Sequence, residues 1–200
     1  MVAASPIQRN TAMITFDRRL FLAASAGAAM TAKSAAAKIA YPPFPEGALT
    51  GKGPGDFDFL TGEWTIELRN FDTSGPNGKE VKKASATVHR MLNGAASIEE
   101  LRRGDGTMWG MGVRVWLPEK KQWADHWTAA QSGLVNPPQL GTFIGGAGLF
   151  LADDEHEGKP IKTRAVWDKI TPTSCRWYQC MSKDQGKTWE YGWYMDWTRV

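Results

Sequence analysis

Residues 187–200, "KTWEYGWYMDWTRV", end the chain with a regular alternation of side-chain types. Large apolar side chains occupy every second position, and mostly polar residues with one glycine stand between them. Successive side chains of a β-strand point to opposite faces of the sheet. The stretch therefore predicts a strand whose aromatic face is buried, formed by Trp189, Tyr191, Trp193, Met195 and Trp197.

The same alternation recurs along the chain from residue 60 onward, separated by turn-forming sequences. Turn signals include "GPNG", Asn93-Gly94, "GDG", "PEKK" and the polar stretch "DDEHEGKP". The predicted strands cover residues 60–70, 81–92, 95–103, 108–117, 122–130, 140–144, 148–152, 161–170, 174–182 and 187–200. About ten short-looped antiparallel strands in sequence order predict an all-β fold, a single up-and-down barrel, because closure removes exposed edges.

A four-residue loop at 118–121 would set the pairing of the two strands around it. Arg114 would then lie opposite Asp125, Trp116 opposite Trp123, and Gly112 opposite Trp127. One face of this hairpin would carry three tryptophans and an ion pair, which resembles the wall of a ligand pocket. The alternative is that this face is the exterior and that Val113, Val115 and Leu117 point inward. We take the pocket wall as the working prediction.

Residues 182–190, "SKDQGKTWE", fit the aspartate box Ser-x-Asp-x-Gly-x-Thr-Trp of sialidases and related propellers. A propeller would carry one copy in each of several blades, and this chain has a single copy. We interpret the motif as a hairpin turn, in which Asp184 accepts bonds from nearby amides and Gly186 takes a positive φ.

The first residues have the pattern of a targeting signal. Arg18-Arg19 precede a short apolar run and small residues, and Ala35-Ala36-Ala37 provides a cleavage site, which resembles a twin-arginine export signal. An Ala-rich tail without signal function is the alternative. We predict an export signal at 1–37, a Pro/Gly-rich lead-in at 38–55, the barrel domain at 56–200, and a periplasmic or secreted location without a membrane span.

Composition and spacing argue against several classes of partner. The net charge is +3, and no basic run appears beyond the first forty residues, so we predict no nucleic-acid binding. The histidines at 89, 126 and 156 form no metal motif. Cys175 and Cys180 would lie about 16 Å apart in one strand, too far for a disulfide. We predict no metal and no cofactor.

Two adjacent carboxylates, Glu99 and Glu100, would point to opposite faces of one strand, so one of them must face inward. A buried carboxylate needs a partner or a raised pKa, and we considered Arg164, Arg176 and Arg199 as its partner. The candidates named for general acid or base chemistry are Glu100 and Asp125.

Three segments, "GPGDFDFLTGEWTIELRN", "VRVWLPEKKQW" and "SKDQGKTWEYGWYMDWTRV", together resemble an uncharacterised bacterial domain family of lipocalin-like, calycin-type β-barrels. The resemblance covers residues 55–199. Gly62-x-Trp64 is similar to the Gly-x-Trp that lipocalins place at the closed end of the barrel. The resemblance implies a barrel that encloses a small apolar ligand. Some relatives are isomerases, cyclases or haem proteins, but the haem-ligating histidine of nitrobindin-like barrels has no counterpart here.

The sequence thus predicts an exported barrel that binds a small hydrophobic or aromatic molecule in a Trp-lined cavity. The alternative is a cofactor-independent isomerase, lyase or cyclase that uses an inward carboxylate and an arginine. A filled barrel with a structural role is a third possibility, and the oligomeric state and the ligand's identity stay open. The predicted ligand-binding residues are Trp64, Arg114, Trp116, Trp123, Asp125, Trp127, Trp167, Trp193 and Trp197.

Overall fold

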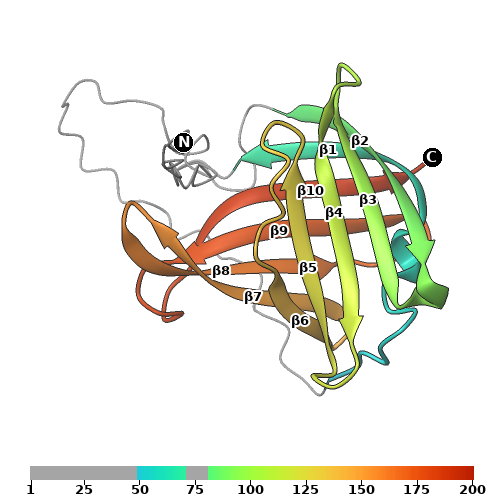
Figure 1. Ribbon diagram of the computed structural model, residues 1–200. Helices are drawn as coiled ribbons and strands as arrows, with labels where there is room; N and C mark the ends of the chain where they lie inside the picture. The colour runs from blue at the N-terminus through green and yellow to red at the C-terminus, as the bar shows by residue number, and fades with distance from the viewer. Residues whose placement is uncertain (1–48, 71–80) are drawn as a thin grey trace, which may run out of the picture. The chain divides into compact units, whose positions relative to one another are not determined.

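The alternating segments form a closed antiparallel barrel in the computed structural model, which describes residues 49–70 and 81–200 (Figure 1). The predicted export signal lies outside the described residues. Ten strands follow one another in these residues: β1 (Gly62–Asn70), β2 (Lys82–Met91), β3 (Ala96–Arg103), β4 (Met108–Leu117), β5 (Gln122–Ala129), β6 (Gln139–Ile144), β7 (Ala147–His156), β8 (Lys159–Asp168), β9 (Ser174–Ser182) and β10 (Glu190–Arg199).

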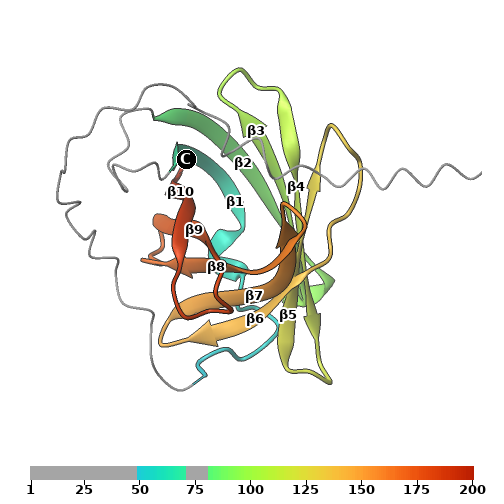
Figure 2. The same cartoon turned by 90° about the vertical axis from the view of Figure 1, so that its left-hand side faces the viewer.

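Each strand pairs with its neighbours in sequence, and β1 pairs with β10 to close the barrel (Figure 2). The predicted all-β up-and-down barrel is therefore confirmed. Two boundaries differ from the prediction. β7 continues through the polar residues to His156, since Asp153 and Asp154 still pair with β8. The β2–β3 connection is wider than a two-residue turn, and Asn93 and Gly94 both have positive φ.

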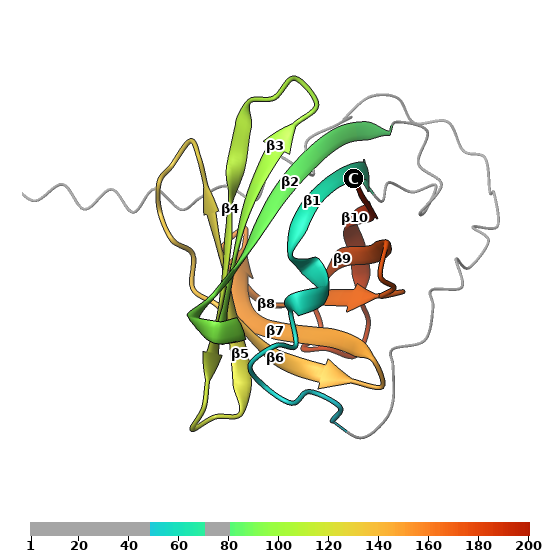
Figure 3. The same cartoon turned by 90° about the vertical axis from the view of Figure 1, so that its right-hand side faces the viewer.

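A short 3-10 helix, η2 (Asp58–Leu60), leads into β1 at one end of the barrel (Figure 3). The core beside it is rich in packed aromatic side chains. The Phe57 ring lies 4.9 Å from Trp123 and 5.3 Å from Phe143, measured between ring centroids. Arg199 covers Trp64 at 4.2 Å and donates to the carbonyls of η2 and the residue after it. We call this the η2 end and the opposite end of the barrel the far end.

A β-bulge in β10 corrects the predicted aromatic face of that strand. Tyr191 pairs with Cys180 while Trp193 pairs with Gln179, so Gly192 is an extra residue between them. One inserted residue shifts the alternation, so side chains before the bulge point to the opposite face from the one that simple alternation predicts. Trp193, Met195 and Trp197 face the core as expected. Tyr191 instead stacks on Tyr178, 5.6 Å away on the opposite face. Trp189 likewise lies under Arg164, at 4.2 Å.

The aspartate-box sequence forms the turn between β9 and β10. The Asp184 carboxylate accepts bonds from the Thr188 amide at 2.8 Å and the Ser182 hydroxyl at 2.7 Å, and Gly186 has a φ of 93°. The Thr188 hydroxyl also donates to this carboxylate and is the main cause that holds the pKa of Asp184 below its usual range, with the other two bonds adding to the effect. The interpretation of this motif as a structural turn is confirmed.

Candidate functional site

The β4–β5 hairpin has the predicted register, and its ion pair faces the interior. Arg114 pairs with Asp125 and Trp116 with Trp123. Arg114 and Trp123 are buried, whereas Val113 and its alternate neighbours are only half-buried on the outer face. The alternative orientation, with the valines inside, is therefore wrong. Because the loop length determines the pairing, the sequence was sufficient to place these side chains together.

Arg114 is the centre of a buried charge cluster made by three neighbouring strands, β3, β4 and β5. Its Nη2 lies 2.5 Å from Glu99 Oε2, and its Nε lies 3.5 Å from Asp125 Oδ1. The side chains of Arg114 and Glu99 are 4% exposed and that of Asp125 is 12% exposed. We call these three residues the Arg114 cluster.

The cluster rests against the aromatic packing of the η2 end. The guanidinium carbon of Arg114 lies 5.2 Å from the ring centroid of Phe57 and 5.1 Å from that of Trp167. A guanidinium over an aromatic face is attracted by the ring quadrupole, most strongly when both are desolvated. Gly112 makes room for the ion pair, since a Cβ there would lie 3.2 Å from Arg114 Nη2 and 3.4 Å from Glu99 Oε2.

Several buried polar atoms inside the barrel have no hydrogen-bond partner among the described residues. Arg114 has two such nitrogens, Nε and Nη1. Nε lies near Asp125, but that contact is an ion pair without hydrogen-bond geometry. The indole Nε1 atoms of Trp167 and Trp197 are also unpartnered, as is Ser97 Oγ. Buried polar groups are nearly always hydrogen-bonded in folded proteins. This group of atoms therefore marks the site.

Burial and the charge of the neighbouring side chains shift the pKa values of Asp125 and Arg114 in opposite directions. Burial raises the pKa of Asp125 from its usual 3.8 to about 6, and Glu99 adds to this effect while Arg114 opposes it. Burial lowers the pKa of Arg114, but Asp125 and Glu99 more than offset this, so the net change is upward. Asp125 thus titrates close to neutral pH beside a permanent cation. Burial also raises the pKa of the nearby Cys175 thiol to about 12, which keeps it protonated.

The raised pKa of Asp125 predicts a specific pH dependence of stability. A carboxyl with a raised folded-state pKa contributes stability that is complete below 3.8 and is lost as pH rises through about 6. As the pH falls from 7.5 to 4.5, the unfolding free energy of wild type should therefore rise by about 2 kcal/mol relative to that of Asp125→Asn. This figure uses ~1.4 kcal/mol for each unit of difference between the folded and unfolded pKa values. Urea unfolding at both pH values measures it.

The control for this measurement is Asp153→Asn, because the Asp153 side chain is 85% exposed and forms a surface ion pair with Lys162. Its unfolding free energy should follow that of wild type at both pH values. A difference between wild type and Asp125→Asn that does not change with pH would contradict the raised pKa.

The candidate Glu100 is on the wrong face, and Glu99 is the inward carboxylate. Glu100 is half-exposed and lies 2.5 Å from Arg102. The partner of Glu99 is Arg114, and not one of the three arginines that we considered. Alternation could not decide between the two glutamates, because Ile98 accompanies Glu100 on one face of β3 and Leu101 accompanies Glu99 on the other.

The structure places all seven predicted tryptophans in the core cluster or against it. Trp64, Trp123, Trp167 and Trp197 are fully buried, and Trp116, Trp127 and Trp193 are partly buried against them. The prediction missed Trp109 and Trp177, which also pack on the core. Trp109 meets Trp193 near the far end at a centroid distance of 5.3 Å. Trp109 is the extra residue where the β3–β4 register shifts between Leu101 and Arg102, so alternation could not reveal its direction.

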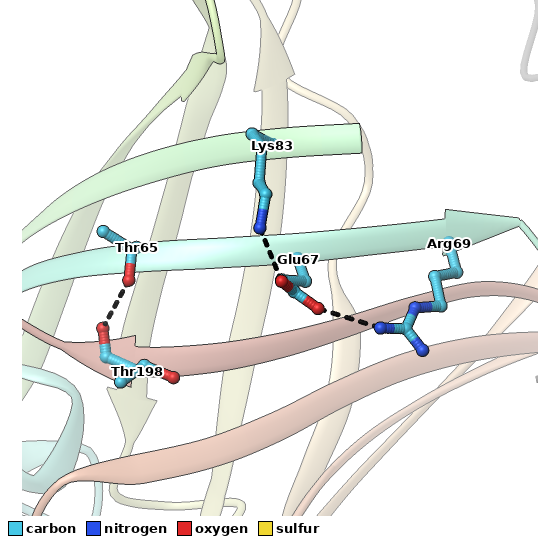
Figure 4. A network of polar contacts seen from close by, with 5 residues as sticks. All are labelled: Thr65, Glu67, Arg69, Lys83 and Thr198. Carbon is cyan, nitrogen blue, oxygen red and sulfur yellow. Dashed lines mark hydrogen bonds and ion pairs between the residues drawn. The ribbon is translucent and has the colours of Figure 1, made fainter. Parts of the chain in front are cut away.

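The outer face of the barrel carries a different kind of polar network (Figure 4). Glu67 lies between Lys83, at 2.5 Å, and Arg69, at 2.8 Å. The bonds from Lys83 and then Arg69 lower the pKa of Glu67. Exposed ion pairs of this type are satisfied by one another and by water and contribute little. One nitrogen of this network, Arg69 Nε, is also buried without a hydrogen-bond partner among the described residues. The Arg114 cluster differs because its unpartnered donors lie inside the barrel, beside two unpartnered indoles.

Within residues 49–70 and 81–200 no group of three or more His, Cys, Asp or Glu side chains could hold a metal ion. His126 contacts the Asn136 carbonyl through Nδ1 at 3.0 Å. No helix in this part of the chain is long and apolar enough to cross a membrane. Cys175 and Cys180 are buried free thiols. Comparison with models of known protein families and with curated proteins finds no match to this chain.

Proposed function

We propose that this protein is an exported, lipocalin-like barrel that binds a small hydrophobic or aromatic molecule in its Trp-lined interior. The observation that carries the proposal is a buried arginine with two nitrogens that have no hydrogen-bond partner among the described residues, set among aromatic side chains. An interior selected only for packing would have no use for such donors, because burying a polar group without a hydrogen bond is costly. Ligand sites typically combine apolar walls with a few polar groups that fix orientation.

The dimensions of the barrel support the same proposal. An eight-stranded barrel already has an interior wide enough for side chains or one small ligand, and the width grows with the number of strands. This barrel has ten strands in its described residues. Several inward positions also carry small side chains, among them Ala84, Ala86 and Ala165. A flat aromatic molecule would pack against the tryptophans above the Arg114 cluster.

Binding of the neutral fluorophore N-phenyl-1-naphthylamine tests the proposal. We expect a saturable fluorescence increase with one site per chain. Ala84→Phe should weaken the affinity at least tenfold, because Ala84 faces the core and a larger side chain there would occupy the ligand's space. Ser85→Phe is the matched control, since Ser85 pairs with Thr65 on the outer face.

Thermal unfolding of both variants establishes that they fold, and Ala84→Leu replaces Ala84→Phe if the larger side chain prevents folding. If the probe does not bind, or if the Ala84 and Ser85 variants bind it equally well, the interior is not a ligand site. The barrel would then be a filled structural domain.

A cofactor-independent isomerase, lyase or cyclase on the same scaffold is the second candidate. The observation that favours it is Asp125, whose pKa of about 6 suits a general acid or base near neutral pH. Arg114 beside it could stabilise a developing oxyanion. Under this alternative Asp125→Asn would bind the probe as wild type does and would lose turnover of the substrate.

A further inference from the structure

We propose that the buried end of the ligand is an uncharged hydrogen-bond acceptor, such as the carbonyl oxygen of an aromatic ketone, quinone or lactone. The inference rests on the proposed ligand-binding function and adds the chemical class of the ligand. Arg114 together with the indoles of Trp167 and Trp197 would receive this oxygen.

The unpartnered atoms inside the barrel are almost all donors. Arg114 Nε and Nη1 and the indole Nε1 of Trp167 and Trp197 can only donate hydrogen bonds. Ser97 Oγ is the one unpartnered interior atom that can also accept. A ligand that satisfies these donors must therefore carry hydrogen-bond acceptors. A ligand that itself ends in a donor, such as an amine, would leave them unsatisfied.

The donors belong to neighbouring side chains. The guanidinium carbon of Arg114 lies 5.1 Å from the ring centroid of Trp167, and Trp167 lies 5.4 Å from Trp197. Ser97 is the cross-strand partner of Arg114 on β3. One small polar group could thus approach donors from β4, β8 and β10.

Other indoles of the η2 end show that packing alone does not leave an indole unpartnered. Trp64 Nε1 donates to the Leu60 carbonyl at 2.7 Å, and Trp123 Nε1 donates to Asp56 Oδ2 at 3.1 Å. Both side chains are as buried as Trp167 and Trp197. The fold therefore supplies partners for two buried indoles, while Trp167 beside Arg114 and Trp197 packed on Trp167 have none among the described residues.

The charge of the cluster selects a neutral acceptor over a carboxylate. Arg114 already has two carboxylates, Glu99 and Asp125, within 3.5 Å. A third carboxylate would add like-charge repulsion in a desolvated place, unless Asp125 first took up a proton. A cationic ligand would be repelled by the guanidinium and by the positive ends of the N–H groups. A carbonyl oxygen accepts hydrogen bonds from the free donors without either kind of charge repulsion.

Calorimetric titration with four naphthalenes that differ only at position 2 tests this inference. The substituents are acetyl, isopropyl, carboxylate and trimethylammonium. We expect 2-acetylnaphthalene to bind at least tenfold more tightly than the isopropyl compound of the same shape, since hydrogen bonds from charged donors are stronger than those between neutral groups. The two charged compounds should bind more weakly than the acetyl compound at pH 7.5.

Two variants connect the preference to the donors. Trp167→Phe and Trp197→Phe each remove an unpartnered N–H and keep an aromatic ring, so the advantage of acetyl over isopropyl should fall at least threefold. Trp189→Phe, on the outer face, should keep it. In the infrared spectrum, the carbonyl stretch of the bound probe should lie below its frequency in hexane, and part of this shift should be lost in Trp167→Phe.

The outcomes separate the two proposals. If none of the four compounds binds, the ligand-binding function itself fails. If the acetyl and isopropyl compounds bind equally, the free donors are satisfied by trapped water and the inference is overturned, while the binding function stands. Tightest binding of the carboxylate at pH 7.5 would likewise overturn it in favour of an anionic ligand.

Discussion

Arg114→Met should lose about 3–5 kcal/mol of unfolding free energy at pH 7.5, the range found when one partner of a buried ion pair is removed. The change leaves Glu99 and Asp125 in the core without their cation. Part of the loss should return in the double variant Arg114→Met/Glu99→Gln, because the neutral amide is less costly to bury than a carboxylate. Urea unfolding followed by far-ultraviolet circular dichroism measures these differences.

The matched control for this experiment is Arg102→Met. Arg102 contacts Glu100 at the same distance of 2.5 Å as Arg114 contacts Glu99, but on the outer face. Exposed pairs contribute at most about 1 kcal/mol, so this variant should be close to wild type. If Arg114→Met costs no more than Arg102→Met, the cluster is hydrated and is not the desolvated site described above.

Trp197→Ala is the second change with a large expected effect, a loss of about 3–5 kcal/mol of unfolding free energy. The Trp197 side chain is 1% exposed and packs against Trp64 and Trp167, at centroid distances of 6.0 and 5.4 Å. Truncation would remove the contacts of a full indole and leave a cavity at the η2 end. Urea unfolding at pH 7.5 gives the value directly.

Trp189→Ala tests the β10 bulge in the same experiment. Trp189 belongs to the same alternating series as Trp197 in the sequence, but the structure places it beneath Arg164 on the outer face. Both side chains are half-buried, and a cation–π contact contributes from about 0.5–1 kcal/mol at exposed sites to about 2 kcal/mol when desolvated, so this variant should lose about 1–2 kcal/mol. Equal losses for Trp189→Ala and Trp197→Ala would mean that both indoles are core residues and that the bulge is absent.

The site itself was only partly predictable. The pairing of Arg114 with Asp125 followed from one local feature, the four-residue loop at 118–121, because β4 and β5 are joined directly. The role of Glu99 did not follow, since it depends on how β3 aligns with β4 across an irregular hairpin. The unpartnered donors of Trp167 and Trp197 could not be foreseen either. They come from strands distant in sequence from Arg114 and meet it only across the interior.

By itself, the sequence determined the number and order of the strands, their antiparallel pairing and the barrel, because two-residue alternation and turn residues act over a few neighbouring positions. Only the tertiary structure decided which of the two similar faces of β3 is buried, and how Trp109 and the start of β10 are directed. The physical reason is that side-chain direction has a period of two, so one bulged residue reverses it for the adjoining segment. Bulges at Trp109 and at Gly192 do this here. The first turns Trp109 toward the core, and the second places Trp189 and Trp197 on opposite faces.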